Sequence, residues 1–120
     1  MKEKYGVCRL NKTELIPQWA EKGDFFSITR TSDELSIVCS EDNIPSGIKC
    51  EKDWRVLKIE GTLDFSLIGI LASISTILAQ KGISIFAIST YDTDYILIKN
   101  EDTDKAINSL INEGYEIIKF

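Results

Sequence analysis

The chain has 120 residues, a net charge of −5 and a hydrophobic share of 43%, which leaves room for one ordinary domain or two very small fused ones. The negative charge and the lack of any basic run argue against a nucleic-acid or anionic-membrane surface. The sequence contains no histidine, which removes Ser-His-Asp and Cys-His nucleophiles and the commonest general base. An enzyme would have to work through carboxylates, lysine, tyrosine or a bare thiol.

The first ten residues, MKEKYGVCRL, lack the apolar segment of a secretory signal. The longest apolar stretch, residues 67–78, is too short and too rich in hydroxyl side chains to span a bilayer. The cysteines, Cys8, Cys39 and Cys50, are odd in number and form no Cys-x-x-Cys pair, so neither a disulfide framework nor a zinc site is indicated. We expect a cytoplasmic protein with buried reduced thiols, no metal and no cofactor.

Three strands and one short helix are predicted in the first half. Pro17 fits the first turn of the helix and Gly23 fits the position just past its end. Polar residues 41–53, EDNIPSGIKCEKD, read as a linker or a decayed helix. Alternation and turn signals place the strands at Tyr5–Leu10, Phe25–Arg30 and Leu35–Ser40, the last two forming a hairpin.

The second half begins with a strand, Trp54–Ile59, that is apolar on both sides and therefore predicted to be interior. Asp64 and Ser66 are candidate caps for a helix over Leu67–Lys81, which Gly82 ends. This helix is apolar on more than one side, which predicts packing on more than one side. A second hairpin (Ile83–Ser89 and Tyr95–Lys99, joined by TYDTD), a helix from Thr103 to Gly114 and a closing strand (Tyr115–Phe120) complete the chain.

The two hairpins resemble each other in sequence. At an offset of 60 residues, Ile28 falls on Ile88 and Glu34 falls on Asp94. This similarity predicts two copies of one unit of about sixty residues, the second in the ferredoxin-like order β-α-β-β-α-β. The first copy lacks a second helix. Its last strand is either Ile48–Cys50 or the strand Trp54–Ile59 that opens the second copy.

Several segments resemble the ACT domain, a small ligand-binding regulatory module. They are TRTSDELSIVC at Thr29, WRVLKIEG at Trp54, LDFSLIGILASI at Leu63 and ISTYDTDYILIK at Ile88. The whole chain is similar to the tandem-ACT family related to CASTOR-type arginine sensors and aspartate-kinase regulatory domains. The resemblance implies an α+β fold of two ferredoxin-like (βαββαβ) units in tandem, with antiparallel sheets and helices packed on one face. The first unit (1–52) is degenerate, the second covers 53–120, and strand 54–59 is a candidate for sharing.

The same resemblance implies a non-catalytic protein that binds an amino acid or a similar metabolite. ACT ligands usually lie between the strand-to-helix loop of one unit and a strand edge of a neighbour. The loop is then Asp64–Ile70 and the partner element is Ser89–Asp94. The first unit has no glycine before its helix, which puts a second equivalent site in doubt. The predicted ligand-binding residues are Asp64, Ser66, Gly69, Ile70, Ser89, Thr90, Tyr91, Asp92 and Asp94.

The chemistry of an amino acid suits these residues. Its carboxylate needs N–H donors, which a helix N-terminus supplies, and Gly69 permits close approach of the backbone. The alternative is that Gly69 only allows tight helix–sheet packing. Its ammonium needs a carboxylate. Asp94 is favoured over Asp92 because Glu34 keeps an acid at the equivalent position, although Asp and Thr are also ordinary turn formers. Tyr91 either lines the pocket or is an exposed turn aromatic.

A homodimer is expected, because the apolar helix and the open edges of small sheets favour association. The rival function is a protein-interaction module that regulates a partner enzyme without a small ligand. A hydrolase using Asp92 and Asp94 is a distant third. Neither histidine, nor metal-ligand spacing, nor a phosphate loop accompanies these two carboxylates.

Overall fold

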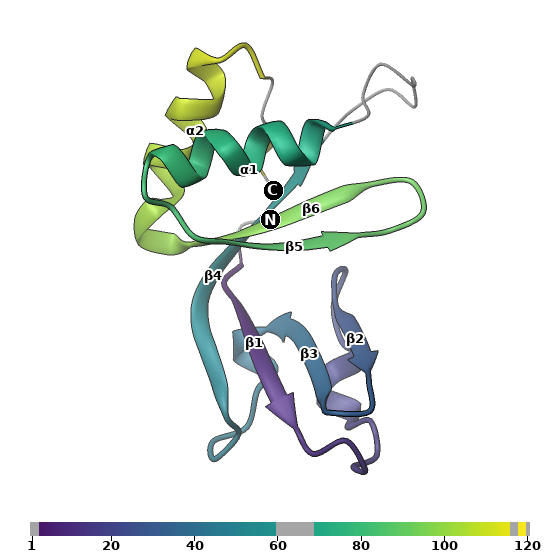
Figure 1. The fold of residues 1–120 in the computed structure, drawn as a ribbon. Helices are drawn as coiled ribbons and strands as arrows, with labels where there is room; N and C mark the ends of the chain where they lie inside the picture. The colour runs from purple at the N-terminus through teal and green to yellow at the C-terminus, as the bar shows by residue number, and fades with distance from the viewer. Residues whose placement is uncertain (1–2, 60–68, 116–117, 120) are drawn as a thin grey trace. The chain divides into compact units, whose positions relative to one another are not determined.

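The computed structural model describes residues 3–59, 69–115 and 118–119 (Figure 1). Two compact units divide the chain. The N-terminal unit is Glu3–Trp54, and the C-terminal unit is Arg55–Phe120 together with Met1–Lys2. Both combine antiparallel strands with a few helices, so the predicted α+β class is confirmed.

The N-terminal unit is a four-stranded antiparallel sheet with almost no helix. Its strand order is β2-β3-β1-β4, and each neighbouring pair is antiparallel. The predicted short helix is a single 3-10 turn, η1 (Gln18–Glu21), which follows Pro17 as expected. A second 3-10 turn, η2 (Glu41–Asn43), follows β3. The strands are β1 (Tyr5–Leu10), β2 (Ser27–Arg30), β3 (Leu35–Ser40) and the first half of β4 (Cys50–Ile59).

The core of this unit lies on one face of that sheet. It contains the buried side chains of Cys8, Leu10, Ala20, Leu35, Ile37, Cys39 and Ile44. Gly6 also belongs to this packing, because a Cβ atom at this position would collide with the side chain of Ile44. Nearby, the rings of Tyr5 and Phe25 meet edge to face, with centroids 5.8 Å apart.

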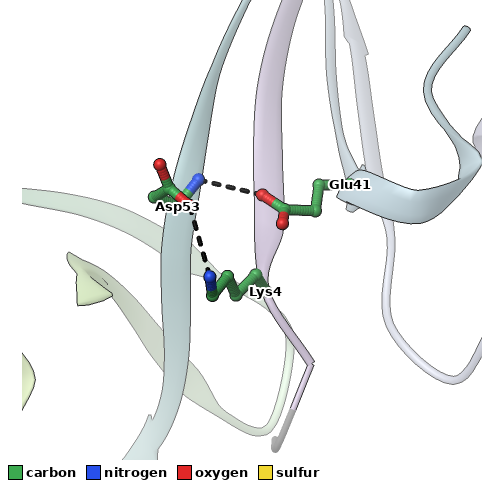
Figure 2. A network of polar contacts seen from close by, with 3 residues as sticks. All are labelled: Lys4, Glu41 and Asp53. Carbon is green, nitrogen blue, oxygen red and sulfur yellow. Dashed lines mark hydrogen bonds and ion pairs between the residues drawn. The ribbon is translucent and has the colours of Figure 1, made fainter.

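Strand β4 contains a bulge just before it leaves the N-terminal unit. Tyr5 pairs with Trp54 and Val7 with Glu51, so two residues of β4 oppose Gly6 alone. One of the two, Asp53, has a positive φ of 66°. Figure 2 shows how neighbours hold it: its N–H donates to Glu41 Oε2 at 3.0 Å, and Lys4 Nζ lies 3.5 Å from Asp53 Oδ1.

The length of β4 corrects one prediction. Residues 50–53 were expected in a linker or a decayed helix, but they are the start of this ten-residue strand. The two alternatives for the closing strand of the N-terminal unit are therefore parts of one element. Cys50–Trp54 pairs with β1, and Leu57–Lys58 pairs with the last strand of the C-terminal unit.

The C-terminal unit keeps the predicted β-α-β-β-α-β order. Strand β4 neighbours β6 and pairs with β7, and β6 pairs with β5. Its helices are α1 (Ile70–Gln80) and α2 (Thr103–Asn112), the latter preceded by the 3-10 turn η4 (Asn100–Asp102). The remaining strands are β5 (Ile85–Ser89), β6 (Asp94–Lys99) and β7 (Ile118–Lys119).

The two helices of the C-terminal unit supply most of its core. Ile74 and Leu78 of α1 are buried, as are three positions of α2, whereas Ser73, Thr76 and Gln80 form the exposed polar ridge that the sequence predicted. Thr103 does not cap α2, since its hydroxyl donates to the Lys99 carbonyl at 3.2 Å. The buried core consists of Leu57, Ile74, Leu78, Ile83, Ile96, Ile98, Ala106, Ile107 and Leu110.

The two hairpins correspond at an offset of 59 residues, not the predicted 60. Ile28 pairs with Ile37 in the first hairpin, and Ala87 pairs with Ile96 in the second. Ile37 and Cys39 face one core, and the residues 59 positions later, Ile96 and Ile98, face the other. An offset of 60 would turn each of these side chains to the opposite face of its sheet.

Candidate functional site

Helix α1 begins at a glycine whose backbone conformation requires glycine. Gly69 precedes the first helical residue with φ 89° and ψ 5°, in the left-handed region. No described atom lies within 4 Å of the position that a Cβ would occupy at this residue. The alternative that Gly69 serves tight helix–sheet packing therefore finds no support among the described residues.

The first turn of α1 presents backbone donors rather than side-chain caps. The first helical hydrogen bond runs from Ser73 N–H to the Gly69 carbonyl at 2.8 Å, so the N–H groups of Ile70, Leu71 and Ala72 precede it. Glycine has no side chain with which to cap them. Ile70 itself is half-buried and packs against the core. The N-terminal end of α1 can therefore accept a carboxylate on its N–H groups, with a favourable helix dipole.

The predicted polar residues of the second hairpin gather around one tight turn. Thr90 N–H and Thr90 Oγ1 both donate to the Thr93 carbonyl, at 2.8 and 3.0 Å, and Ser89 pairs with Asp94 across the strands. Asp94 is half-buried and Asp92 is exposed. Tyr91 is fully exposed at the tip, so in this chain it is a turn aromatic.

The turn and the start of α1 lie at the same end of the C-terminal unit (Figure 1). The chain reverses between α1 and β5 through a tight turn, in which Ile83 N–H donates to the Leu78 carbonyl at 2.9 Å. Helix α1 has 11 residues, about 16 Å, and β5 has 5 residues, about 17 Å, so β5 returns to the level at which α1 began. Two other predicted site residues, Asp64 and Ser66, lie outside the described residues.

Comparison with known proteins identifies this architecture. A family model of the ACT domain matches residues 49–112, and a model of an N-terminal domain matches residues 3–47. This chain belongs to the ACT domain family. The family resemblance expected from the sequence is thus confirmed.

Three relatives place the chain within that family. Subunit 1 of the human cytosolic arginine sensor for mTORC1 is 28% identical over 100 residues, covering 74% of this chain but only 30% of the sensor. A crystal structure from Agobacterium tumefaciens is 41% identical with a TM-score of 0.92, covering 97% of this chain and 87% of that one. The regulatory subunit of aspartate kinase from Thermus thermophilus shares the fold at 13% identity and a TM-score of 0.63, covering 92% and 91%.

The corrected offset changes the argument for Asp94 in the ACT unit. At 59 residues, Glu34 corresponds to Thr93, since Thr31 N–H donates to the Glu34 carbonyl at 2.9 Å as Thr90 N–H donates to that of Thr93. Asp94 then corresponds to the buried Leu35, so the first hairpin does not keep an acid at that position. Asp92 corresponds to Asp33, and both are exposed turn residues.

The N-terminal unit has no comparable helix terminus. Its 3-10 turn η1 has 4 residues, too few to align backbone dipoles as α1 does. The loop before it already receives a cation: the guanidinium of Arg30 donates to the carbonyl oxygens of Lys12 and of Glu14, the latter at 2.6 Å. Those carbonyls face a positive charge, which is the opposite polarity to a carboxylate-binding loop.

Sequence reasoning missed a shallow groove beside α1. It has a volume of about 470 Å³ and opens widely to solvent. Its lining starts one turn after Gly69 and combines hydroxyl, apolar and acidic groups, from Ala72, Ser73, Thr76, Ile77, Glu113 and Tyr115. The polar ridge of α1 was the available signal, because hydroxyl residues interrupt an otherwise apolar helix.

Two negative findings apply to the described ranges 3–59, 69–115 and 118–119. Within them, no three acidic or thiol side chains are grouped so as to hold a metal ion. No helix within them has the length and apolar character needed to traverse a bilayer.

Proposed function

We propose that the ACT unit reversibly binds an α-amino acid and that binding serves regulation rather than catalysis. The observation that carries the proposal is the pairing, at one end of the unit, of an uncapped helix N-terminus with an acid-bearing hairpin turn. The first suits the ligand's carboxylate and the second suits its ammonium group. The regulatory relatives among ACT proteins support the same conclusion.

In this proposal the N–H groups of Ile70 and its two successors hold the carboxylate. Asp94 accepts the ammonium from the edge of the β5–β6 hairpin, with Ser89 opposite it. Half-burial of Asp94 keeps its side chain in a less polar setting than that of the fully solvated Asp92, which strengthens a charge-assisted hydrogen bond. Asp64 and Ser66 complete the loop as originally predicted.

The test is a thermal-shift screen of the purified chain against the twenty amino acids. A ligand that binds only the folded state raises the apparent stability with its concentration, by about 2.7 kcal/mol at a hundred times its Kd. We expect one or a few amino acids to shift the melting temperature, and Asp94→Asn to abolish that shift. Asp33→Asn is the matched control, because it removes an exposed acid from the equivalent hairpin and should leave the shift unchanged.

We further propose that the protein acts in the cytoplasm as a homodimer built of two ACT units per chain, the first of them degenerate. Sedimentation equilibrium across a range of protein concentrations tests the dimer. If no amino acid shifts the melting temperature, simple amino-acid sensing fails and a protein-interaction module takes its place. Leu15, whose side chain is 89% exposed on the loop held by Arg30, is then the first contact to mutate.

A further inference from the structure

The three cysteines of the chain meet in the core of the N-terminal unit. Cys8 on β1 and Cys39 on β3 are buried, and the partly exposed Cys50 at the start of β4 packs against the same cluster. The sequence predicted three separate buried thiols, since nothing in the spacing indicates that distant strands bring them together. Sheet order β3-β1-β4 places Cys8 between the other two.

The register sets which thiols can join. Cys8 and Cys50 lie directly opposite each other on antiparallel strands, so their side chains share a face. The neighbouring Arg9 N–H donates to the Lys49 carbonyl at 3.0 Å, which makes Arg9–Lys49 the hydrogen-bonded pair and Cys8–Cys50 the non-hydrogen-bonded one. Cα atoms of such pairs are about 4.5 Å apart, at the near end of the range that a disulfide bridges.

Cys39 is close to Cys8 but less suitably placed for a covalent bond. Cys8 lies opposite Ile37, so Cys39 is a diagonal neighbour, at a typical separation of about 7–8 Å. It interacts with Cys8 through a hydrogen bond in which the Cys8 thiol is the donor. That bond raises the pKa of Cys8, and it lowers the pKa of Cys39 by favouring the thiolate acceptor.

We propose that Cys8 and Cys50 form a redox modification site, in which a peroxide converts the two thiols into a cross-strand disulfide. The Cys50 sulfur attacks the O–O bond of the peroxide and becomes a sulfenic acid, with release of an alcohol or water. The Cys8 sulfur then attacks the Cys50 sulfur. The S–S bond forms, the hydroxyl leaves as water with the Cys8 proton, and two thiols have lost two electrons to the peroxide.

The setting of Cys50 fits a site that responds to peroxide slowly. Partial burial raises the pKa of Cys50, which lowers its thiolate fraction and hence its reactivity at neutral pH. Among the three, only Cys50 has a partly exposed side chain, so an oxidant reaches it first. The described residues offer no metal-holding group of three that includes these thiols, so metal binding is the less favoured use of the cluster.

The test is peroxide treatment of the reduced full-length chain, followed by thiol counting and by peptide mapping under non-reducing conditions. We expect the titratable thiols of the denatured chain to fall from three to one, and a linked pair of peptides containing Cys8 and Cys50. Cys39→Ser is the matched control, because it removes a core thiol but keeps the opposed pair. It should give the same linked peptides, whereas Cys8→Ser and Cys50→Ser should each give none.

Three outcomes would overturn the proposal. The first is a thiol count that stays at three, and the second is a linkage between Cys8 and Cys39. The third is oxidation of Cys50 alone to the sulfinic acid while Cys8 remains free. Circular dichroism of each variant before treatment establishes that a missing linkage does not come from an unfolded chain. The amino-acid screen is independent of this test, so either proposal can fail without the other.

Discussion

The two units of this chain have nearly the same hairpin and very different surroundings. A glycine with positive φ precedes each hairpin, Gly23 in one unit and Gly82 in the other. A 3-10 turn follows each, η2 in one and η4 in the other. The helices differ: the 11-residue α1 stands where the N-terminal unit has the 4-residue η1, and only the ACT unit continues from its 3-10 turn into a long helix.

Chain length between fixed points accounts for the difference. From Leu10, where β1 ends, to Gly23 there are 13 positions, but from Ile59 to Gly82 there are 23. Ten extra residues are enough for a loop and nearly three helical turns. The lesson is that shared strand pairing does not imply a shared binding site. The feature suited to an anion, a helix long enough to have a dipole, lies in the longer connection.

The largest effect that tests this comparison is truncation of the matched core residues Ile37 and Ile96. Both are essentially fully buried, and they occupy equivalent positions in the two hairpins. Each Ile→Ala change should destabilise the protein by about 2–5 kcal/mol, the cost of lost contacts plus a cavity. The two tryptophans lie in the N-terminal unit and both long helices in the ACT unit, so urea unfolding is followed by fluorescence and by circular dichroism.

Ile37→Ala should shift the fluorescence transition most, and Ile96→Ala the far-ultraviolet transition. Ser84→Ala, an exposed change, is the control for both. Equal shifts of both probes by both variants would show that the two units unfold as one, and the comparison of separate cores would then lose its thermodynamic meaning.

An intermediate effect belongs to the N-terminal unit alone. Burial raises the pKa of Tyr5 to about 12, with help from the charges of Glu3 and Asp24. In the unfolded chain the phenol ionises near 10, so between these values the folded state holds the proton more tightly. Stability should therefore fall by about 2–3 kcal/mol as pH rises from about 10 to 12, and this term should be flat below pH 9.

Tyr5→Phe should make that decline shallower. The quantity to compare is the slope of unfolding free energy against pH, measured by tryptophan fluorescence, because the substitution also alters packing at every pH. An unchanged slope in the variant would mean that other groups cause the loss of stability in base.

The smallest effect concerns the two glycines that the units share. Gly23 has φ 95° and Gly82 has φ 73°, and no described atom lies within 4 Å of a Cβ at either position. Alanine at each should cost about 1–2 kcal/mol from backbone strain alone, and the two costs should be similar. Thermal denaturation of both variants measures them. A cost confined to Gly82→Ala would mean that the turn after η1 relaxes and that the correspondence of the units is only apparent.

Much of the fold could be predicted from local patterns. Strands Tyr5–Leu10 and Leu35–Ser40 were placed at their observed bounds, because alternation and turn residues mark both ends. The α+β class and the ACT family followed from the second half of the chain. The start of β4 was missed, since Cys50–Asp53 are polar residues around a bulge, where the alternation that reveals strands is broken.

The site was less accessible to such reasoning. Sequence similarity suggested an offset of 60 because Ile28 and Ile88 are identical, but hydrogen bonding in the turns decides the register, and it gives 59. The gathering of Cys8, Cys39 and Cys50 depends on sheet order, which no local pattern encodes. The assignment of Asp94 as an ammonium ligand remains a prediction, as does that of Ser89 and Thr90.

Strand β4 determines how this protein can be taken apart. Its first half pairs with β1 and its second half with β7, so any cut between residues 47 and 55 removes a strand from one of the units or divides it. A fragment that ends near residue 47 would leave β1 with an open edge, ready to pair with another chain and to precipitate. Exchange of sensory modules between relatives should therefore succeed when β4 travels whole with both of its partners, and fail when it is split.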